Sequence, residues 1–242
     1  MPEKISVIIP VYNEAKRLER CVTEVKRASR NLGIYFEVVI SEDGSTDGTD
    51  KIACELANED SAVKHLHSDV RLGRGKAIRR AFDVVDGDIV IYVDVDLSTD
   101  LQHLIDLIKA IEDGADIATG SRLLAGSVVR RPLQREMTSR IYNWMVRWIF
   151  NSAIHDHQCG FKAFKKVTVT PLLDKVKDKH WFWDTEIIIR ALRNGCNVIE
   201  IPITWVQSKE TKVRLVADIK YMAMSTLKLW WQLGKERRQL KG

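Results

Sequence analysis

The chain has 242 residues, of which 45% are hydrophobic and 29% charged, and its formal net charge is +5. This composition is ordinary for a globular protein and excludes low-complexity, collagen-like and extensively disordered chains. No apolar run approaches the roughly 20 residues that a membrane-spanning helix needs. The length suits one large domain, so we expect residues 1–242 to fold as a single domain.

The N-terminus and the cysteines indicate a compartment. The chain runs directly into a short apolar strand pattern, without the apolar region of a secretory leader. Its four cysteines are scattered and form no closely spaced pair: Cys21, Cys54, Cys159 and Cys196. We therefore expect reduced thiols in a cytoplasmic protein.

Charge is concentrated at the C-terminal end. Residues 209–242 hold nine Lys and Arg against three acids, a balance of +6, so the remainder is near −1. Such an asymmetry favours contact with an anionic surface at one end of the molecule over binding to nucleic acid.

In the first half, short β-branched runs alternate with amphipathic helix patterns. Strands are predicted at 5–9, 36–40, 63–66, within 88–96, and at 116–119. The helices between them are marked by Leu18, Val22 and Val25, by Ile52 and Leu56, by Ile78 and Ala81, and by Leu101, Leu104 and Ile108. This order predicts an α/β fold with a Rossmann-like, mostly parallel sheet flanked by helices. Ligands of such sheets bind at the carboxyl ends of the strands, where each polar cluster falls.

The pattern changes after Arg122, where arginines punctuate a segment with a single acid. A wide apolar stripe follows at helical spacing, formed by Ile141, Trp144, Met145, Trp148 and Ile149. Two interpretations stay open: a helix in the core, or a helix lying in a membrane interface with Trp at headgroup depth. A late strand is predicted at 198–204.

The tail predicts a second amphipathic helix. Its apolar side holds Leu215, Ile219, Met222, Leu229, Trp230 and Leu233. Lysines and arginines lie among and beyond them, and because this charge is of one sign we favour a membrane surface over a merely solvated face.

Two carboxylates follow the fourth predicted strand. Alternation along an extended chain puts Asp94 and Asp96 on the same side. A pair of hard oxygen ligands suits Mg²⁺ or Mn²⁺ held jointly with the phosphates of a substrate. The motif alone is equally compatible with two solvated loop acids.

Four motifs together resemble glycosyltransferase family 2. They are Val7-Ile8-Ile9-Pro10-Val11-Tyr12-Asn13-Glu14, Glu42-Asp43-Gly44-Ser45-Thr46-Asp47, Gly73-Arg74-Gly75-Lys76-Ala77 and Asp94-Val95-Asp96. The resemblance covers most of residues 5–122 and implies a GT-A fold. It implies that residues 1–122 bind the nucleotide sugar, that 123–205 form the acceptor half, and that 206–242 form a basic amphipathic tail.

Two later motifs narrow the resemblance to the polyprenyl-phosphate glycosyltransferases, which include dolichyl-phosphate mannosyltransferase and dolichyl-phosphate β-glucosyltransferase. They are Asp156-His157-Gln158-Cys159-Gly160-Phe161-Lys162 and Trp181-Phe182-Trp183-Asp184-Thr185-Glu186. Both look closer to the glucosyl branch. Ser98 stands where mannosyl enzymes usually carry Gln, which removes one expected metal ligand and puts the donor sugar in doubt.

The resemblance also assigns residues on the donor side. It implies that Pro10, Tyr12, Glu14 and Asp43 line the nucleoside pocket. It also implies that Val95, which stands between the two metal ligands in the sequence, belongs to the donor site. Without the family resemblance, Asp43 would be interpreted as a turn residue. Lys76 is predicted to meet donor phosphate or sugar, against the alternative of an exposed first-turn lysine.

The implied acceptor is a lipid monophosphate, which needs cationic residues rather than a strong base. We expect Arg122 first, then Arg131 and Lys162, to hold it, with a surface charge as the alternative for Arg131. Asp184 and Glu186 are expected to contact sugar hydroxyls or to support Lys162. His155 and His157 flank Asp156, and we expect them outside the metal site.

The predicted reaction is therefore an inverting, metal-dependent transfer of a hexose from a nucleotide sugar, UDP-glucose or else GDP-mannose, to a polyprenyl or dolichyl monophosphate. Asp94 and Asp96 would hold Mg²⁺ or Mn²⁺, and Asp96 and the cationic residues would be catalytic. We expect a peripheral protein at the cytoplasmic face of the membrane, attached by the two amphipathic segments or by a separate membrane partner.

Three alternatives remain at this point. A family-2 transferase with a hydroxyl acceptor would need Asp184 or Glu186 as a base. A sugar-nucleotide-binding scaffold would need no intact carboxylate pair. A Rossmann oxidoreductase is disfavoured because no Gly-x-Gly-x-x-Gly follows the first strand.

Overall fold

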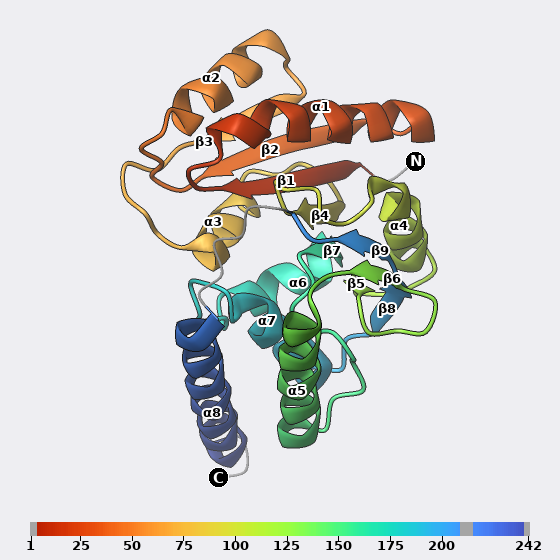
Figure 1. Ribbon diagram of the computed structural model, residues 1–242, viewed down its shortest axis with the longest axis vertical. Helices are drawn as coiled ribbons and strands as arrows, with labels where there is room; N and C mark the ends of the chain where they lie inside the picture. The colour runs from red at the N-terminus through yellow and green to blue at the C-terminus, as the bar shows by residue number, and fades with distance from the viewer. Residues whose placement is uncertain (1–3, 209–214, 240–242) are drawn as a thin grey trace.

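The computed structural model describes residues 4–208 and 215–239 and is organised around one seven-stranded sheet (Figure 1). The strand order is β3-β2-β1-β4-β7-β5-β8. The strands are β1 (Ile5–Val11), β2 (Phe36–Glu42), β3 (Val63–Leu66), β4 (Ile89–Val93), β5 (Ile117–Ser121), β7 (Phe161–Lys165) and β8 (Val198–Pro202). Every neighbouring pair is parallel except those of β7, which runs antiparallel to β4 and β5. The predicted mostly parallel α/β sheet is confirmed.

Helices cover both faces of this sheet. One face packs against α1 (Ala15–Leu32), α2 (Thr49–Glu59) and α4 (Leu104–Glu112), which follows the short 3-10 turn η1 (Leu101–His103). The other face packs against α3 (Arg74–Ala81), α6 (Lys166–Leu173) and α7 (Trp183–Arg193). The central strands β1 and β4 are buried along their whole length, as their near-continuous apolar sequences require.

Two further helices project from one end of the sheet, α5 (Leu133–Phe150) and α8 (Leu215–Gln239) (Figure 1). They pack on each other and on α7 through a third apolar cluster that includes Val146, Phe150, Met222 and Leu229. No helix in the described ranges combines the length and the apolar character needed to cross a bilayer.

The apolar stripe predicted on α5 does not face the core. Ile141, Trp144 and Trp148 are 64%, 67% and 77% exposed. The buried face of α5 instead carries Asn143, Val146 and Phe150. The polar Asn143 is buried because its side-chain oxygen accepts hydrogen bonds from the backbone N and from Nδ1 of His157, both at 2.9 Å. The interpretation of this stripe as a core face was therefore wrong.

The prediction for the tail helix is corrected in part. Met222, Leu229 and Leu233 are buried, as predicted, whereas Trp230 is 55% exposed, because it follows Leu229 by one residue and so points about 100° away. Of the other positions assigned to this apolar side, Leu215 and Ile219 lie where side chains fall outside the described part of the structure.

The strand predicted at 198–204 is two strands in different sheets. β8 ends at Pro202, and β9 (Thr204–Val206) pairs with β6 (Val128–Arg130) in a separate two-stranded sheet. Ile203 lies between them, with its backbone N donating to Ser127 Oγ. Strand β7 had no counterpart in the sequence prediction, although it lies in the middle of the main sheet.

Candidate active site

A cavity of about 710 Å³ opens at the carboxyl ends of β1, β2 and β4. Most of the residues predicted for the donor side and the acceptor phosphate line it: Pro10, Tyr12, Glu14, Asp43, Asp94, Val95, Asp96, Arg122 and Arg131. Two predicted residues, Lys76 and Lys162, do not. The carboxyl edge of the parallel strands thus gathers side chains from distant parts of the sequence, as the fold class predicts.

Asp94 sits at the base of this cavity, within a ring of charges. Arg74 Nη2 donates to Asp94 Oδ1 at 2.5 Å, and Arg74 Nη1 reaches Asp184 Oδ2 at 3.3 Å. Burial raises the pKa of Asp94 to about 6; Arg74 opposes that rise, while the negative charges of Asp96 and Asp184 add to it. Asp94 is therefore close to two further carboxylates as well as to its partner Arg74.

Gly160 is required where it stands because the chain passes directly over Asp94. A Cβ at position 160 would lie 1.9 Å from Asp94 Oδ2 and 2.8 Å from Arg74 Nη2. No side chain fits there unless the carboxylate moves. Steric crowding by Asp94 therefore explains the glycine in the motif at 156–162.

Asp96 is oriented by its own loop. The backbone N of Ser98 donates to Asp96 Oδ1 at 3.0 Å, and Ser98 Oγ donates to Oδ2 at 2.8 Å. Ser98 therefore supports the second carboxylate. Asp94 and Asp96 still present hard oxygen donors with lone pairs to one cavity, so the residues fit Mg²⁺ or Mn²⁺.

Lys162 does not reach the cavity. Its ammonium group is fully buried, bonded to Asp184 Oδ1 at 2.9 Å and to the carbonyl of Cys159. Tyr92 also donates its hydroxyl to Asp184 Oδ1. In this arrangement Lys162 is no phosphate clamp; it neutralises Asp184, which lines the cavity, and this agrees with the expected support between these two residues.

Arg74 is the cation that sequence reasoning missed. Lys76 was selected from the same motif, but it is exposed and points away from the cavity. Arg74 is the first residue of α3, and its guanidinium bridges Asp94 and Asp184. The sequence did carry a signal for Arg74. A residue at the start of a helix that follows the carboxyl end of a strand lies near that edge of the sheet.

Asp43 has both a structural and a cavity role. Its carboxylate accepts from the backbone N of Leu72 at 2.6 Å and of Gly73 at 2.9 Å, which ties β2 to the start of α3. Gly73 adopts a φ of 102°, a conformation that favours glycine. Nearby, the guanidinium of Arg71 lies 4.0 Å from the ring centre of Tyr12.

Arg122 is held by a buried carboxylate. Its Nε and Nη2 donate to Asp156 at 2.7 and 2.9 Å, and its backbone N donates to the same side chain at 3.0 Å. Although burial alone would raise it, the charge and hydrogen bonds of Arg122 hold the pKa of Asp156 well below its usual range. Arg122 therefore presents a fixed guanidinium to the cavity.

Arg131 differs from Arg122 because its charge lacks a partner. Within the described part of the chain, its Nε and Nη2 are buried and have no hydrogen-bond acceptor. Burial, and then the neighbouring charge of Arg122, lower its pKa. A buried guanidinium without a partner is costly unless an anion completes it. Arg131 lines the cavity, so an anion bound there could supply the missing acceptor.

The far end of the same cavity is apolar. It is lined there by Ile141, Tyr142 and Met145 from α5 and by Met222 and Ala223 from α8. Ile141 also begins the exposed stripe that continues along α5 through Trp144 and Trp148. The lining of one cavity thus includes carboxylates, arginines and apolar residues of the two projecting helices.

Glu186 belongs to the packing of α7. Its carboxylate accepts from Arg190 Nε at 2.8 Å and from the backbone N of Lys177 and Asp178 at 3.1 and 2.9 Å. We predict that Glu186→Ala lowers the free energy of unfolding by about 3–5 kcal/mol, because it leaves Arg190 buried without its main partner. Urea denaturation measures this, with Glu236→Ala, at the half-exposed second acid on Arg190, as the control. Equal stability of parent and Glu186→Ala would contradict it.

His157 predicts a pH dependence of stability. Its ring is buried between Asn143 and Ser152, and burial lowers its pKa from 6.5 to about 3. The unfolded chain therefore binds a proton that the folded chain rejects, so the unfolding free energy falls as pH drops from 6.5 toward 3. The loss is about 1.4 kcal/mol per pH unit. Urea titrations at pH 6.5 and 5 should differ by about 2 kcal/mol more for the parent than for His157→Gln. Identical differences would disprove the role of His157.

Comparisons with known proteins identify a sequence family, several relatives and a shared fold. Residues 6–170 match the sequence profile of glycosyl transferase family 2. Glycosyltransferase AglD of Haloferax volcanii is 46% identical over 233 residues, which cover 95% of this chain and 37% of AglD. The chain therefore spans little more than a third of that relative's length.

Two other relatives are covered over most of their length. Polyprenol monophosphomannose synthase of Mycolicibacterium smegmatis is 32% identical over 211 residues, 85% of this chain and 78% of the synthase. Dolichyl-phosphate beta-glucosyltransferase of Saccharomyces cerevisiae is 28% identical over 239 residues, 90% of this chain and 72% of that protein.

The fold is shared with a solved glycosyltransferase. The structure of glucosyl-3-phosphoglycerate synthase from Mycobacterium tuberculosis in complex with Mn²⁺ and UDP-glucose superimposes with a TM-score of 0.67 at 17% identity. It covers 93% of this chain and 78% of that one. Because only 17% of the aligned residues are identical, this similarity establishes the GT-A-like fold alone.

Proposed function

Because the chain belongs to glycosyltransferase family 2, we propose that it transfers a hexose, with inversion, from a nucleotide sugar to a polyprenyl monophosphate at the cytoplasmic face of a membrane. One observation carries the proposal. A single cavity joins a carboxylate pair, two arginines and an apolar surface. A donor diphosphate, an acceptor phosphate and a lipid chain need these three kinds of surface within one site.

On the donor side, Pro10, Tyr12, Glu14 and Asp43 would bind the nucleoside, with Val95 beside the diphosphate. Asp94 and Asp96 would hold Mg²⁺ or Mn²⁺, which when bound would neutralise the charge of the departing nucleoside diphosphate. UDP-glucose is the favoured donor: the yeast relative is a glucosyltransferase and the solved neighbour holds UDP-glucose. The mycobacterial mannose synthase supports GDP-mannose as the alternative.

On the acceptor side, an oxygen of the lipid phosphate would attack the anomeric carbon as the bond to the nucleoside diphosphate breaks. That oxygen is already anionic near neutral pH, so the step needs positioning rather than proton removal. The buried, unpartnered guanidinium of Arg131 and the fixed guanidinium of Arg122 would hold the phosphate in line. Attack from the opposite side inverts the configuration.

A hydroxyl acceptor would need a general base, and the two candidate acids suit that role poorly. Asp184 is 1% exposed, and its carboxylate already accepts from Lys162, Tyr92 and Arg74. Glu186 is bound to Arg190 and does not line the cavity. The pairing of both acids supports the phosphate acceptor over the hydroxyl acceptor.

We propose that α5 and α8 lie in the lipid interface. Trp144 and Trp148 on α5 and Trp230 and Trp231 on α8 are between 55% and 77% exposed. The two helices are neighbours and extend from the same end of the sheet (Figure 1). The tail that includes α8 carries the +6 charge balance. Indole rings favour headgroup depth, and the basic residues favour anionic lipid.

Replacing Trp144 and Trp148 together with Ser is predicted to weaken binding to anionic vesicles by about tenfold or more, because two interfacial anchors are lost. Vesicle sedimentation at low salt measures the change. Tyr35→Ser provides the control, since Tyr35 is an aromatic residue 72% exposed outside α5 and α8. The interfacial role fails if the double variant and the parent bind alike.

The proposed reaction is tested by a transfer assay with a short polyprenyl phosphate. Radiolabelled UDP-glucose, UDP-GlcNAc and GDP-mannose are offered separately, each with MgCl₂, MnCl₂ or EDTA. We expect label from UDP-glucose to enter the organic phase, and only when a divalent ion is present. Label that stays in water with every donor, in the presence of vesicles, would contradict the proposal.

A further inference from the structure

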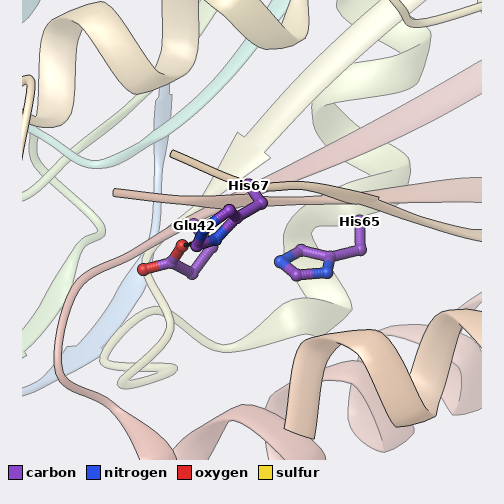
Figure 2. Close-up of side chains that lie close together, drawn as sticks. All are labelled: Glu42, His65 and His67. Atoms are coloured by element: carbon purple, nitrogen blue, oxygen red, sulfur yellow. Dashed lines mark hydrogen bonds and ion pairs between the residues drawn. The ribbon is translucent and has the colours of Figure 1, made fainter. Parts of the chain in front are cut away.

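A second cluster of potential ligands lies at the carboxyl edge of the sheet, one strand beyond the cavity. Figure 2 shows Glu42, His65 and His67 side by side, with the ring of His65 directed toward the Glu42–His67 pair. One ligand atom from each lies within 4.8 Å of the other two. None of the three lines the cavity described above.

The sheet register explains why these side chains meet. In the parallel pair of β2 and β3, Ile40 is opposite His65 and Ser41 is opposite Leu66. Continuing this register places Glu42 next to His67. Because His65 and His67 are two residues apart on an extended chain, their side chains share one face of the sheet.

The cluster has unused coordination capacity. His65 Nε2 is buried and has no hydrogen-bond partner in the described part of the chain. A buried ring nitrogen without a partner is unfavourable, and a metal bond would offset that cost. The Glu42 carboxylate is fully buried and contacts His67 Nδ1 at 2.7 Å.

The outer contacts are those of a metal-binding histidine. His67 Nδ1 donates to Glu42 Oε2 at 2.7 Å, and a metal ion bound between them would displace this proton. The proton on Nε2 would then face Asp69 Oδ1, which lies 3.3 Å away. Metal-ligating histidines commonly donate their other ring nitrogen to a carboxylate in this way. Arg80 Nη2 donates to the carbonyl of His67 at 2.6 Å and fixes its backbone.

We propose that Glu42, His65 and His67 bind one Zn²⁺ ion, with water as the fourth ligand. Two imidazoles and a carboxylate are borderline ligands that favour Zn²⁺ over Mg²⁺. Ligand atoms of a tetrahedral zinc site lie about 3.4 Å apart, so small side-chain rotations complete the set. His67 is 47% exposed, which leaves room for water.

Bound zinc would tie β2 to the end of β3. Glu42 immediately precedes Asp43, and its carboxylate also accepts from the backbone N of Ser45. The ion would therefore rigidify the loop that carries Asp43 toward the cavity. This site is separate from the Asp94–Asp96 pair and does not depend on the proposed reaction.

The test measures zinc binding by the full chain carrying Asp96→Asn, so that the carboxylate pair does not contribute. After removal of metal with EDTA and dialysis, ZnCl₂ is titrated calorimetrically, and Co²⁺ is titrated with visible absorption as the readout. We expect one equivalent of Zn²⁺, a four-coordinate Co²⁺ spectrum and a raised melting temperature.

Substitutions then assign the ligands. His65→Gln and His67→Gln should each weaken zinc binding by more than about tenfold, and Asp69→Asn by about tenfold. Asp69 is 98% exposed, so its replacement leaves packing intact. His155→Gln, in a similar pair with Glu200 at 2.8 Å, is the matched control and should bind as the parent does. Absence of saturable Zn²⁺ binding, or undiminished binding by His65→Gln, overturns the proposal.

Discussion

Replacing Asp96 with Asn is expected to reduce sugar transfer by about 10³-fold, because one of two carboxylates that would hold the divalent ion becomes neutral. The amide keeps the size of the side chain. Its oxygen can still accept the hydrogen bond that the backbone N of Ser98 donates to Asp96 Oδ1 in the parent protein. The loop should therefore keep its shape while the charge at the diphosphate is lost. Initial rates with radiolabelled UDP-glucose and polyprenyl phosphate measure the effect.

Asp88→Asn is the matched control for this substitution. Asp88 is an exposed residue that immediately precedes β4, at the end of the strand opposite Asp94. It should leave both turnover and melting temperature unchanged. If Asp96→Asn turned over at a rate close to that of Asp88→Asn, the carboxylate pair would not serve the reaction.

The second large effect is expected for Arg131→Ala, which should lower kcat/KM for polyprenyl phosphate by about 10²–10³-fold. The loss should be confined to the acceptor, so slow hydrolysis of the donor by water should continue at the parental rate. Arg131→Lys should recover only part of the activity, since an ammonium cannot form the paired hydrogen bonds of a guanidinium.

The same substitution should not destabilise the protein. Within residues 4–208 and 215–239, Nε and Nη2 of Arg131 are buried and have no hydrogen-bond acceptor, so alanine removes a desolvated charge rather than a formed ion pair. We expect the free energy of unfolding to stay equal or rise. Arg130→Ala is the control, because Arg130 is the exposed neighbour on β6 and does not line the cavity. A loss of donor hydrolysis equal to the loss of transfer would contradict an acceptor role.

The first half of the fold, up to Arg122, was predictable from sequence because its signals are local. Buried parallel strands appear as continuous β-branched runs, and the polar residues that follow them must meet at one edge. Val63–Leu66 was predicted with its observed bounds. Pro10, Tyr12, Asp43, Asp94 and Asp96 reach the cavity for that reason.

The part of the fold after Arg122 was harder to predict, because its organisation depends on contacts between residues that are distant in sequence. Strand β7 is inserted between β4 and β5, and its only local signal is a short run containing the buried Lys162. Lys162 was predicted to hold the acceptor phosphate, but it is buried and paired with Asp184, 22 residues later. No period or composition reveals such a pair.

Periodicity misled the interpretation of α5 because it shows that residues share a face without showing where that face points. Ile141, Trp144 and Trp148 do share one, but α7 and α8 cover the opposite face of the helix. The cluster of Glu42, His65 and His67 escaped notice for a related reason. Its histidines are two residues apart, but the third member comes from the neighbouring strand.

The most direct test of the proposed reaction compares two acceptors that differ only in the phosphate. Polyprenyl phosphate and the free polyprenol of the same chain length are presented in identical vesicles with UDP-glucose and MnCl₂. We predict a glucosylated product, cleaved by mild acid, from the phosphate alone. Equal or greater transfer to the free alcohol would contradict a lipid-phosphate acceptor held by Arg122 and Arg131.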